Sequence, residues 1–402
     1  MPVMRFRGRD FPIKTRTLVV VVISVLLASV GLTGRIISMR EFREDDAARR
    51  SAPATVPGPA SAYAEAVRAA ALAGLDAARR KDPANDAFYF ADGVWQTGKP
   101  LCFRCNVGPG VVAAALGSLR NDPDLVSVAE QTIDPPLSRH RSENGALGIP
   151  AQGEDGPDIQ TMSFAGQLGL TLYILQDKLD PARVQTWTEA LRGATEFLIS
   201  NGNYAWYTNG NITLGNAMVA ALTWKLTGDA RYQAVYANAL AFAERPPAAQ
   251  WPGRGLVLTK NPTLADGSDG AGYLTEAGSG SPGFDADYAQ VQADEAAVIA
   301  LVTQDPEAIR LANLLVNQLL PRVDRKTWLL DTSGGSRHPD SKRTVPFTTS
   351  ALAVLAANGR ADLAPLVQSQ ALQSVKYLVD DRGDGAYTMW GTRLAPLLIA
   401  VR

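Results

Sequence analysis

The sequence predicts an all-α protein: an (α/α) toroid of about ten to twelve helices, with long loops on one rim and one transmembrane helix in front of it. Helical hydrophobic spacing recurs from residue 61 to the end of the 402-residue chain, and tight connections alternate with long ones. Strand-like segments are short and sparse, the clearest being 256–258 and 328–330. No repeat of fixed period is visible, so a regular repeat array is disfavoured and an irregular helical solenoid is the alternative.

The N-terminal segment is typical of a membrane anchor. Residues 1–16 are basic, and the run that follows them carries no charge and is rich in Val and Leu. We therefore expect a cytoplasmic tail at 1–16 and a transmembrane signal-anchor at 17–37, with a cleaved signal peptide as the alternative. The positive-inside rule then makes the chain a single-pass protein of the cell membrane whose catalytic domain is extracytoplasmic. Residues 38–60, charged and then rich in Pro and Ala, predict a linker to a toroid domain at 61–402.

Capping residues mark several helix ends in that domain. Asp180 and Asp305 are each followed by a proline, which is the pattern of an N-cap before the first helical residue. Gly228 ends a helix and Asp229 caps the next one. Further helices are expected at 64–80, 110–119, 160–176, 288–302, 348–357, 361–378 and 391–401.

Composition narrows the classes of function. The chain has 39 Lys and Arg against 40 Asp and Glu, which argues against a nucleic-acid partner because such proteins normally carry a basic face. Two histidines are too few for a multi-histidine metal site. Calcium at Asp266, Asp269, Asp285 or Asp287 has no regular loop spacing to support it, so we expect no metal and no cofactor.

The stretch from Asp266 to Gln292 is where we expect the chemistry, because a long loop rich in glycine and acid on a helical scaffold usually carries function. A paired Glu and Asp in it would suit acid–base hydrolysis of a glycosidic bond. A tyrosine at a helix start could instead act in β-elimination. A solvated surface loop is the alternative without function. The reactive side chains of the stretch are Tyr273, Glu276, Asp285, Asp287 and Tyr288.

A second candidate segment, NYAWYTNGN, precedes a predicted helix at residues 203–211. Aromatic rings such as Trp206 and Tyr207 stack on sugar faces, and amides such as Asn209 and Asn211 bond hydroxyls or a carboxylate. These residues are therefore predicted to bind substrate, with Asn211 a candidate for the reaction itself. The alternative is that Asn211 only caps its helix.

Two turns add basic side chains. Arg337 and His338 lie in a Gly- and Ser-rich turn and suit a carboxylate or an anionic intermediate. Arg139 and His140 lie in a polar, basic segment that could line the same rim. Exposed surface is the alternative for both turns.

The two cysteines, Cys102 and Cys105, form a CxxC motif. In an extracytoplasmic domain a local disulfide is the leading interpretation. A zinc site would have to recruit both His140 and His338, and a thioredoxin-like role lacks its βαβ surroundings.

In order and type, the helix pairs, the NYAWYTNGN segment, the DGSDGAGYLTEAGSGSPGFDADY segment and the later GGSRH turn resemble the catalytic domains of (α/α)-toroid polysaccharide lyases and related toroid glycosidases. The resemblance covers most of residues 60–402 and is one of pattern. It implies a toroid fold and a glycan substrate.

The lyase side of the resemblance implies roles for single residues. Asn211, or Asn209, would neutralise a uronic acid carboxylate, and Tyr288 would remove and return the proton with help from Arg337. His338 would be the nearest histidine candidate. The family's histidine usually lies between the Asn and the Tyr, where this chain has none, so hydrolysis by the carboxylates of the acidic stretch stays open.

Together these features predict a membrane-anchored carbohydrate-active enzyme that cleaves a polysaccharide or a cell-envelope glycan, with β-elimination ahead of hydrolysis. It should bring Asn211, Tyr288 and Arg337 to one cleft. The alternative is a non-catalytic glycan-binding or envelope-assembly protein on the same scaffold, without converging acid–base groups. A helical scaffold for protein partners is a third class.

Overall fold

The computed structural model describes residues 61–79, 107–148, 157–246, 255–277, 282–337, 339, 342–380 and 389–401, and the backbone of four short strands outside these ranges. The chain divides into two compact units, Met1–Ala60 and Ser61–Arg402. In the first unit, β1 (Val3–Phe6) and β2 (Arg9–Pro12) form an antiparallel hairpin. The predicted signal-anchor and linker lie outside the described residues. Among the described residues, no helix combines the length and the apolar character that a membrane span requires.

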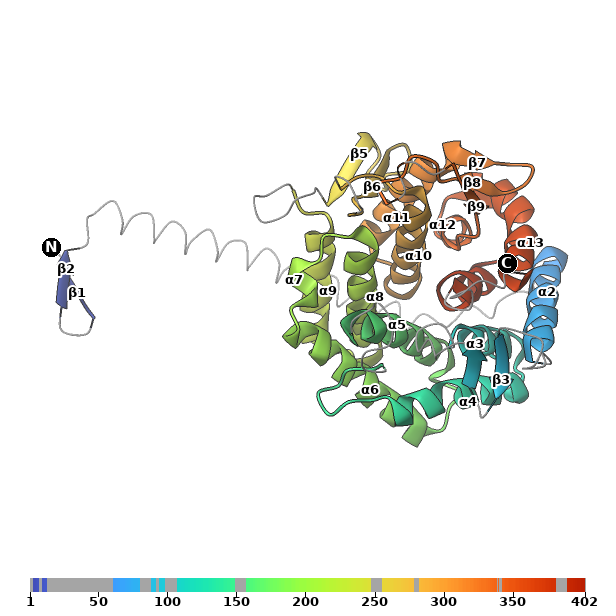
Figure 1. Cartoon of the computed structure of the whole chain (residues 1–402), viewed down its shortest axis with the longest axis horizontal. Helices are drawn as coiled ribbons and strands as arrows, with labels where there is room; N and C mark the ends of the chain where they lie inside the picture. The colour runs from blue at the N-terminus through green and yellow to red at the C-terminus, as the bar shows by residue number, and fades with distance from the viewer. Residues whose placement is uncertain are drawn as a thin grey trace. The chain divides into compact units, whose positions relative to one another are not determined.

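The second unit is built around a closed ring of inner helices, which Figure 1 shows in the view along the short axis. Each inner segment packs against the next along the chain, and the last returns to the first. The inner segments that the structure describes are α3 (Gly108–Arg120), α5 (Pro157–Leu175), α8 (Gly210–Thr227), α10 (Ala286–Thr303), α12 (Ala351–Ala357), and a π-helical turn, η3 (Trp390–Leu394), continued by α15 (Ala395–Ala400).

A second layer of helices covers the ring from outside (Figure 1). The outer helices are α4 (Pro123–Arg139) on α3, α6 (Pro181–Ser200) on α5, α9 (Ala230–Ala243) on α8, α11 (Pro306–Leu319) on α10, α13 (Ala364–Asp380) on α12, and α2 (Ala62–Arg79) between α13 and α3. Short helices α7 (Asn203–Trp206), η1 (Leu320–Arg322) and η2 (Ala361–Leu363) lie in connections. This arrangement is consistent with the predicted (α/α) toroid.

The predicted helix signals act as expected. Asp180, Asp229 and Asp305 each accept a backbone hydrogen bond as N-cap, from the N–H groups at positions 182, 231 and 307. Gly228 ends α8 in the left-handed region, with φ of 68°. Inner and outer helices differ in sequence because α8 and α10 are buried on nearly all sides, whereas an outer helix such as α11 buries one face.

Strands are few and short, in antiparallel sheets. They are β3 (Phe88–Ala91) with β4 (Val94–Thr97), β5 (Leu256–Lys260) with β6 (Ala271–Leu274), and β7 (Val323–Asp324), β8 (Leu329–Asp331) and β9 (Thr344–Pro346) in that order. The expected strands at 256–258 and 328–330 correspond to β5 and β8. Their partners β6, β7 and β9 were not predicted.

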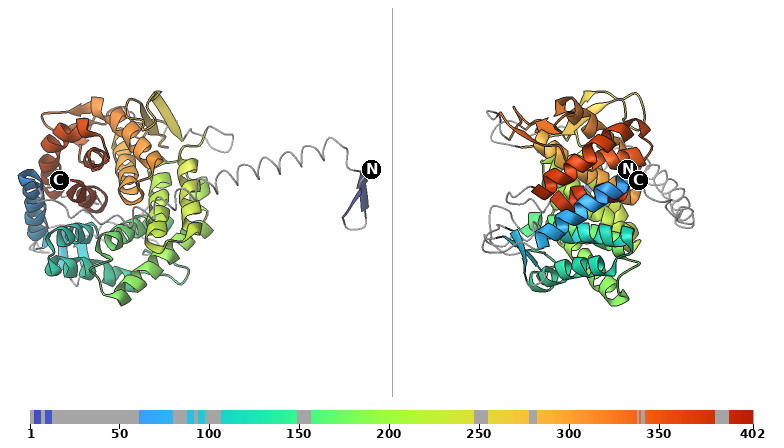
Figure 2. Two further views of the ribbon diagram at one scale, coloured as in Figure 1. Left: turned by 180° about the vertical axis from the view of Figure 1, so that it is seen from behind. Right: turned by 90° about the vertical axis from the view of Figure 1, so that its right-hand side faces the viewer.

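The first and last described helices of the unit close the ring. Arg68 on α2 donates from Nη2 to the carbonyl of Val401 at 3.1 Å. The Tyr63 hydroxyl donates to the carbonyl of Val367 on α13 at 2.6 Å. The side view in Figure 2 shows α2 and α13 next to each other.

The N-terminal ends of neighbouring inner helices meet on one rim. Tyr207, just before α8, bonds to Asp158 in the first turn of α5. The N–H of Asn211, in the first turn of α8, reaches Glu276 in the connection that leads to α10. Gln290, in the first turns of α10, receives the N–H of Thr348 just before α12 at 2.7 Å. This rim collects the long connections, and it is where the predicted chemistry lies.

Candidate functional site

Glu276 is the centre of a polar cluster on this rim. It follows β6, and paired backbone hydrogen bonds with Gly283 fix it, at 2.8 Å from its own N–H and 3.0 Å to its carbonyl. The side chain is completely buried. Its Oε1 accepts hydrogen bonds from the backbone N–H of Asn211 at 2.9 Å and from Nε2 of Gln292 at 2.8 Å.

The other carboxyl oxygen of Glu276 is held differently. Within the described residues Oε2 has no hydrogen-bond partner, and Nη1 of Arg337 lies 3.9 Å away. Burial raises the pKa of Glu276 to about 7, against the lowering effect of the Asn211 N–H, Gln292 and Arg337. Near neutral pH this carboxyl therefore exists in both protonation states, which is the property of a general acid.

Arg337 joins three of the predicted residues. Its guanidinium lies over the ring of Tyr288, with 4.2 Å from Cζ to the ring centroid, and it faces Glu276. Its backbone N–H donates to Oδ2 of Asp285 at 3.2 Å. The turn before it needs glycine, because a Cβ on Gly335 would lie 2.5 Å from the same Asp285 oxygen. The Gly-rich turn thus places Arg337 against the acidic stretch.

Asp285 has a structural use for both oxygens. It is the N-cap of α10, where Oδ1 accepts the N–H of Tyr288 at 3.2 Å, and Oδ2 takes the N–H of Arg337. Ser336 adds a second link, from its Oγ to the Glu276 carbonyl at 3.0 Å. Asp285 therefore links the GGSRH turn to the start of α10 through both of its carboxyl oxygens. Glu276, in contrast, has one carboxyl oxygen without a hydrogen-bond partner among the described residues.

The acidic stretch contains three further predicted residues, Tyr273, Asp287 and Tyr288. Burial raises the pKa of Tyr288, and the charge of Arg337 only partly offsets it, so the phenol keeps its proton at neutral pH. Asp287 forms an ion pair with Arg343 at 3.4 Å. Tyr273 packs edge-on against Phe284, with 5.0 Å between ring centroids.

Asn209 and Asn211 lie at the start of α8. Asn209 is the N-cap residue of α8, so the alternative that Asn211 caps this helix is wrong. Asn211 contributes its backbone N–H to Glu276, while its side-chain Oδ1 is buried and has no hydrogen-bond partner in the described structure. Asn211 thus lies beside Glu276 and contacts it through its backbone.

The other predicted residues lie elsewhere on the rim or outside the described ranges. Arg139 ends α4 and His140 is its C-cap, and burial followed by the charge of Arg139 lowers the pKa of that histidine. His338, Cys102 and Cys105 lie outside the described residues, so the predicted disulfide and the histidine role stay predictions. In the described part, no three or more His, Cys, Asp and Glu side chains form a group that could hold a metal ion.

Sequence reasoning missed Glu295, which lies three residues after Gln292 on the same face of α10. Glu295 is 6% exposed, and its Oε2 has no hydrogen-bond partner within the described residues. Burial raises its pKa well above the usual range, and the charges of Glu276 and Asp294 act in the same direction. The available signal was a pair of adjacent acids inside an apolar helical run.

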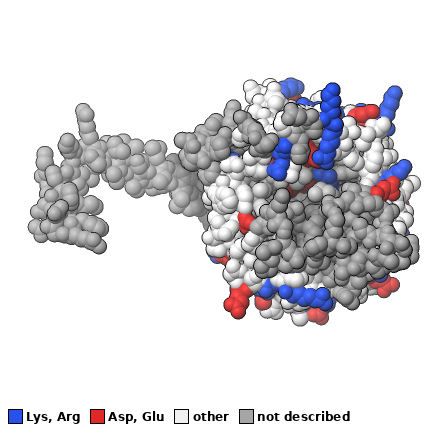
Figure 3. All heavy atoms as spheres, in the orientation of Figure 1, with Lys and Arg blue, Asp and Glu red and all other residues white. Residues whose placement is uncertain are grey.

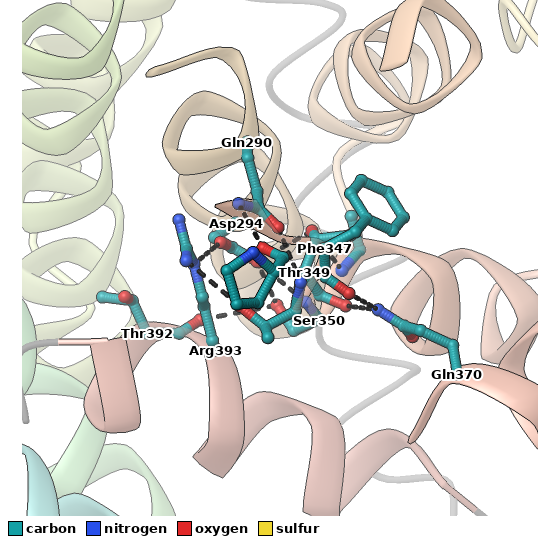
Figure 4. A network of polar contacts seen from close by, with 11 residues as sticks. Gln290, Asp294, Phe347, Thr349, Ser350, Gln370, Thr392 and Arg393 are labelled. Carbon is teal, nitrogen blue, oxygen red and sulfur yellow. Dashed lines mark hydrogen bonds and ion pairs between the residues drawn. The ribbon is translucent and has the colours of Figure 1, made fainter. Parts of the chain in front are cut away.

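Asp294, the residue before it, lies in a closed polar network, drawn in Figure 4. Its Oδ1 accepts from Oγ1 of Thr349 and from the N–H of Ser350, both at 2.8 Å. Its Oδ2 accepts from Nε of Arg393 at 2.6 Å. The network links α10, the start of α12 and the last inner segment.

Charge on the rim is mixed. In the space-filling view of Figure 3, the described part of this face carries both basic and acidic side chains. Near the site, Arg322 lies over the ring of Phe284 at 5.0 Å, and Arg337 and Arg343 pair with acids. The site therefore offers arginines to an incoming anion without being a basic surface overall.

The chain matches no model of a known protein family, and no curated protein matches it. Among solved structures it is similar to an unsaturated glucuronyl hydrolase from Streptococcus agalactiae, with 11% identity and a TM-score of 0.49 over 83% of this chain and 91% of that one. It is also similar to a mutant of that enzyme complexed with dGlcA-GalNAc6S, with 13% identity and a TM-score of 0.49 over 86% and 94% of the two chains. Neither likeness says anything about the chemistry of this chain.

Proposed function

We propose that this protein cleaves a glycan by acid-catalysed hydrolysis, with Glu276 as the proton donor. The observation that carries the proposal is the state of this carboxyl: buried, with a pKa of about 7 and one oxygen without a hydrogen-bond partner among the described residues. An acid with a pKa near the working pH can hold a proton and also release it. A glycosidic oxygen needs such a proton to leave.

The proposed reaction consumes one water molecule and returns Glu276 to its protonated form. Glu276 transfers its proton to the glycosidic oxygen, and the bond from this oxygen to the anomeric carbon breaks. Water then adds its hydroxyl to that carbon, and its remaining proton restores Glu276. The carboxylate formed in between is stabilised by the N–H of Asn211, by Gln292 and by Arg337.

The substrate class follows from the sequence and from the side chains around the acid. The resemblance to toroid lyases and glycosidases implies a glycan. Arg337 and Arg343 favour a sugar that carries a carboxylate or a sulfate, because guanidinium groups bind such anions in a forked geometry. A substrate anion bound to Arg337 would also draw it from Glu276, 3.9 Å away, and open the acid to the substrate.

β-Elimination is the second candidate, supported by the position of Arg337 over Tyr288. In that reaction Tyr288 would take the proton from the sugar ring, which requires a phenolate. Burial raises the pKa of Tyr288, so the phenol suits proton donation better than proton removal. For this reason hydrolysis through Glu276 takes precedence over elimination, reversing the order that the sequence favours.

A product assay tests the proposal. The full chain is incubated with uronic-acid-containing and neutral polysaccharides, and reducing ends and the ultraviolet absorbance of unsaturated uronates are read together. Reducing ends alone support hydrolysis, whereas both signals together mean elimination and overturn the role of Glu276. Neither signal across the panel overturns both reactions and favours the glycan-binding alternative.

We also propose that residues 17–37 anchor the protein in the cell membrane and that the toroid domain faces outward. Support comes from the basic tail and the uncharged run of the sequence. Membrane fractionation and protease treatment of intact cells test it. Recovery of the full chain in the soluble fraction, or a toroid domain that protease reaches only after lysis, contradicts the proposal.

A further inference from the structure

We propose that Trp206 and Tyr207 form a second sugar-binding site on this rim, a flat platform on which a pyranose ring stacks beside the Glu276 cluster. The inference rests on the proposed function only in taking the ligand to be a glycan. It adds a substrate feature: the glycan extends beyond the bond that is cleaved.

Trp206 is unusual in its exposure. It is 52% exposed, and the other large apolar side chains exposed in the described part of the chain are leucines. Its indole stacks on the ring of Tyr207, with 4.1 Å between centroids and 24° between planes. Tyr207 thus covers one face of the indole, and the exposed part of Trp206 is accessible to a ligand.

Hydrogen bonds to neighbouring segments hold Tyr207 and the helix α7 in place. Tyr207 donates its hydroxyl to the carboxylate of Asp158 on α5. Asn203, in the short helix α7 that carries Trp206, is fully buried and accepts a hydrogen bond from Nδ2 of Asn201 at 2.7 Å. A ring that is already fixed loses little conformational freedom when a ligand binds, so such stacking is efficient.

The same segment leads directly to the proposed acid. After Tyr207, the carbonyl of Thr208 accepts from Nη2 of Arg245 at 3.2 Å, and the N–H of Gly210 donates to the carbonyl of Thr275 at 3.0 Å. The next residue, Asn211, holds Glu276. Five residues span at most about 18 Å, so the platform and the acid lie within reach of one short oligosaccharide.

The surroundings fit a sugar better than a protein partner. A pyranose presents an apolar C–H face to an aromatic ring and hydroxyls at its edge. Polar groups for these hydroxyls lie close by in sequence, on Asn201, Thr208 and Asn209. A stable protein interface would bury about 1,000 Å² or more in total, and in the short helix α7 the exposed large apolar side chain is Trp206.

Binding is measured by calorimetry in the Glu276→Gln background of the full chain, so that no turnover interferes. The probes are hyaluronan oligosaccharides of two, four and six sugar units, and cellohexaose. We expect the added change Trp206→Ala to weaken binding of a hexasaccharide about tenfold, with a smaller loss for the disaccharide. Trp206→Phe, which keeps a flat ring, should stay within about threefold.

Leu264→Ala is the matched control, because Leu264 is 56% exposed and lies in another connection. It should leave all affinities unchanged. An unchanged affinity in Trp206→Ala, an equal loss in Leu264→Ala, or no binding of any probe overturns the platform. Product formation by the wild type together with an unaffected Trp206→Ala variant would overturn the platform and leave the proposed function standing.

Discussion

Asp294 and Glu295 are consecutive residues of α10, both are buried acids, and their environments are opposite. In the described part of the chain, Thr349, Ser350 and Arg393 donate hydrogen bonds to the two oxygens of Asp294 (Figure 4). Glu295 has an oxygen with no hydrogen-bond partner among the described residues, and so has Glu276, whose charge it feels. One helix thus carries a satisfied acid and an unsatisfied acid side by side.

The different hydrogen bonding of Asp294 and Glu295 indicates different roles for the two acids. A buried charge is tolerated when donors and a counter-ion surround it, so Asp294 and Arg393 hold three inner segments of the ring together. An oxygen buried without a donor destabilises the fold, with no structural gain in return. Such groups concentrate where a protein needs shifted pKa values for binding or catalysis. The unsatisfied oxygens therefore point to the rim of Glu276 as the functional part of α10.

The largest effect is expected on turnover. Glu276→Gln keeps the shape and the hydrogen bonds of Oε1 but removes the proton donor, so the rate should fall about 10²- to 10⁴-fold. Glu189→Gln, on the exposed face of α6, is the matched control and should keep the wild-type rate. Rates are measured on the substrate that the product assay identifies. A Glu276→Gln variant with wild-type turnover would remove this carboxyl from the mechanism.

A large loss of stability is expected when Asp294, the acid with hydrogen bonds to both oxygens, is replaced. Asp294→Asn leaves the guanidinium of Arg393 buried without a counter-charge, so the free energy of unfolding should fall by about 3–5 kcal/mol. Urea unfolding followed by circular dichroism measures it. Unchanged stability would mean that the Asp294 network does not hold the ring, and the contrast within α10 would be lost.

The matched substitution of the next residue, Glu295, should raise the free energy of unfolding. Glu295→Gln replaces a buried neutral carboxyl by a neutral group of the same shape that does not titrate, so the free energy of unfolding should rise at pH values above the ordinary pKa of a glutamate. The gain should grow with pH. Folded Glu295 keeps a proton that the unfolded chain loses above its ordinary pKa of 4.5, so wild-type stability falls as the pH rises past that value, whereas glutamine does not titrate. A gain that is equal at about pH 5 and about pH 8 contradicts a buried neutral Glu295.

The smallest effect concerns the pH profile. Proton donation by Glu276 requires the protonated form, so kcat/KM should decline on the alkaline side of its pKa of about 7. Arg337 lowers that pKa, so Arg337→Ala should move the alkaline limb to higher pH as well as reduce the rate. Arg343→Ala removes a charge that pairs with Asp287 and should leave the limb in place. A limb that is unmoved in Arg337→Ala would show that Glu276 does not set it.

Local signals in the sequence predict much of the fold. Asp180, Asp229 and Asp305 cap helices because a cap depends only on neighbouring residues. The strands β6, β7 and β9 form by pairing with other strands, and local hydrophobic spacing does not identify that pairing. Closure of the ring also depends on contacts that no local pattern reports.

The site is predictable in part for the same reason. The glycine- and acid-rich stretch and the GGSRH turn supply Glu276, Tyr288 and Arg337, which do come together. The sequence cannot say that Asn211 acts through its backbone, since that follows from the approach of β6 to α8. Glu295 escapes because an inner helix is buried on all sides, so its polar residues show no periodic contrast with their neighbours.

The bond from Arg68 to the carbonyl of Val401 spans 333 positions of the chain, and that from Tyr63 to Val367 spans 304. Helix α2 packs against the nearby α3 as well, so these two bonds add contacts with the far end of the chain. Contacts of such long sequence separation slow folding, because the entropy of closing the loop is lost before they form. During synthesis α2 can pack against α3 early, but its side toward α13 and α15 stays uncovered until nearly the whole chain has emerged. The ring of the toroid is thus closed late, when α2 meets α13 and α15.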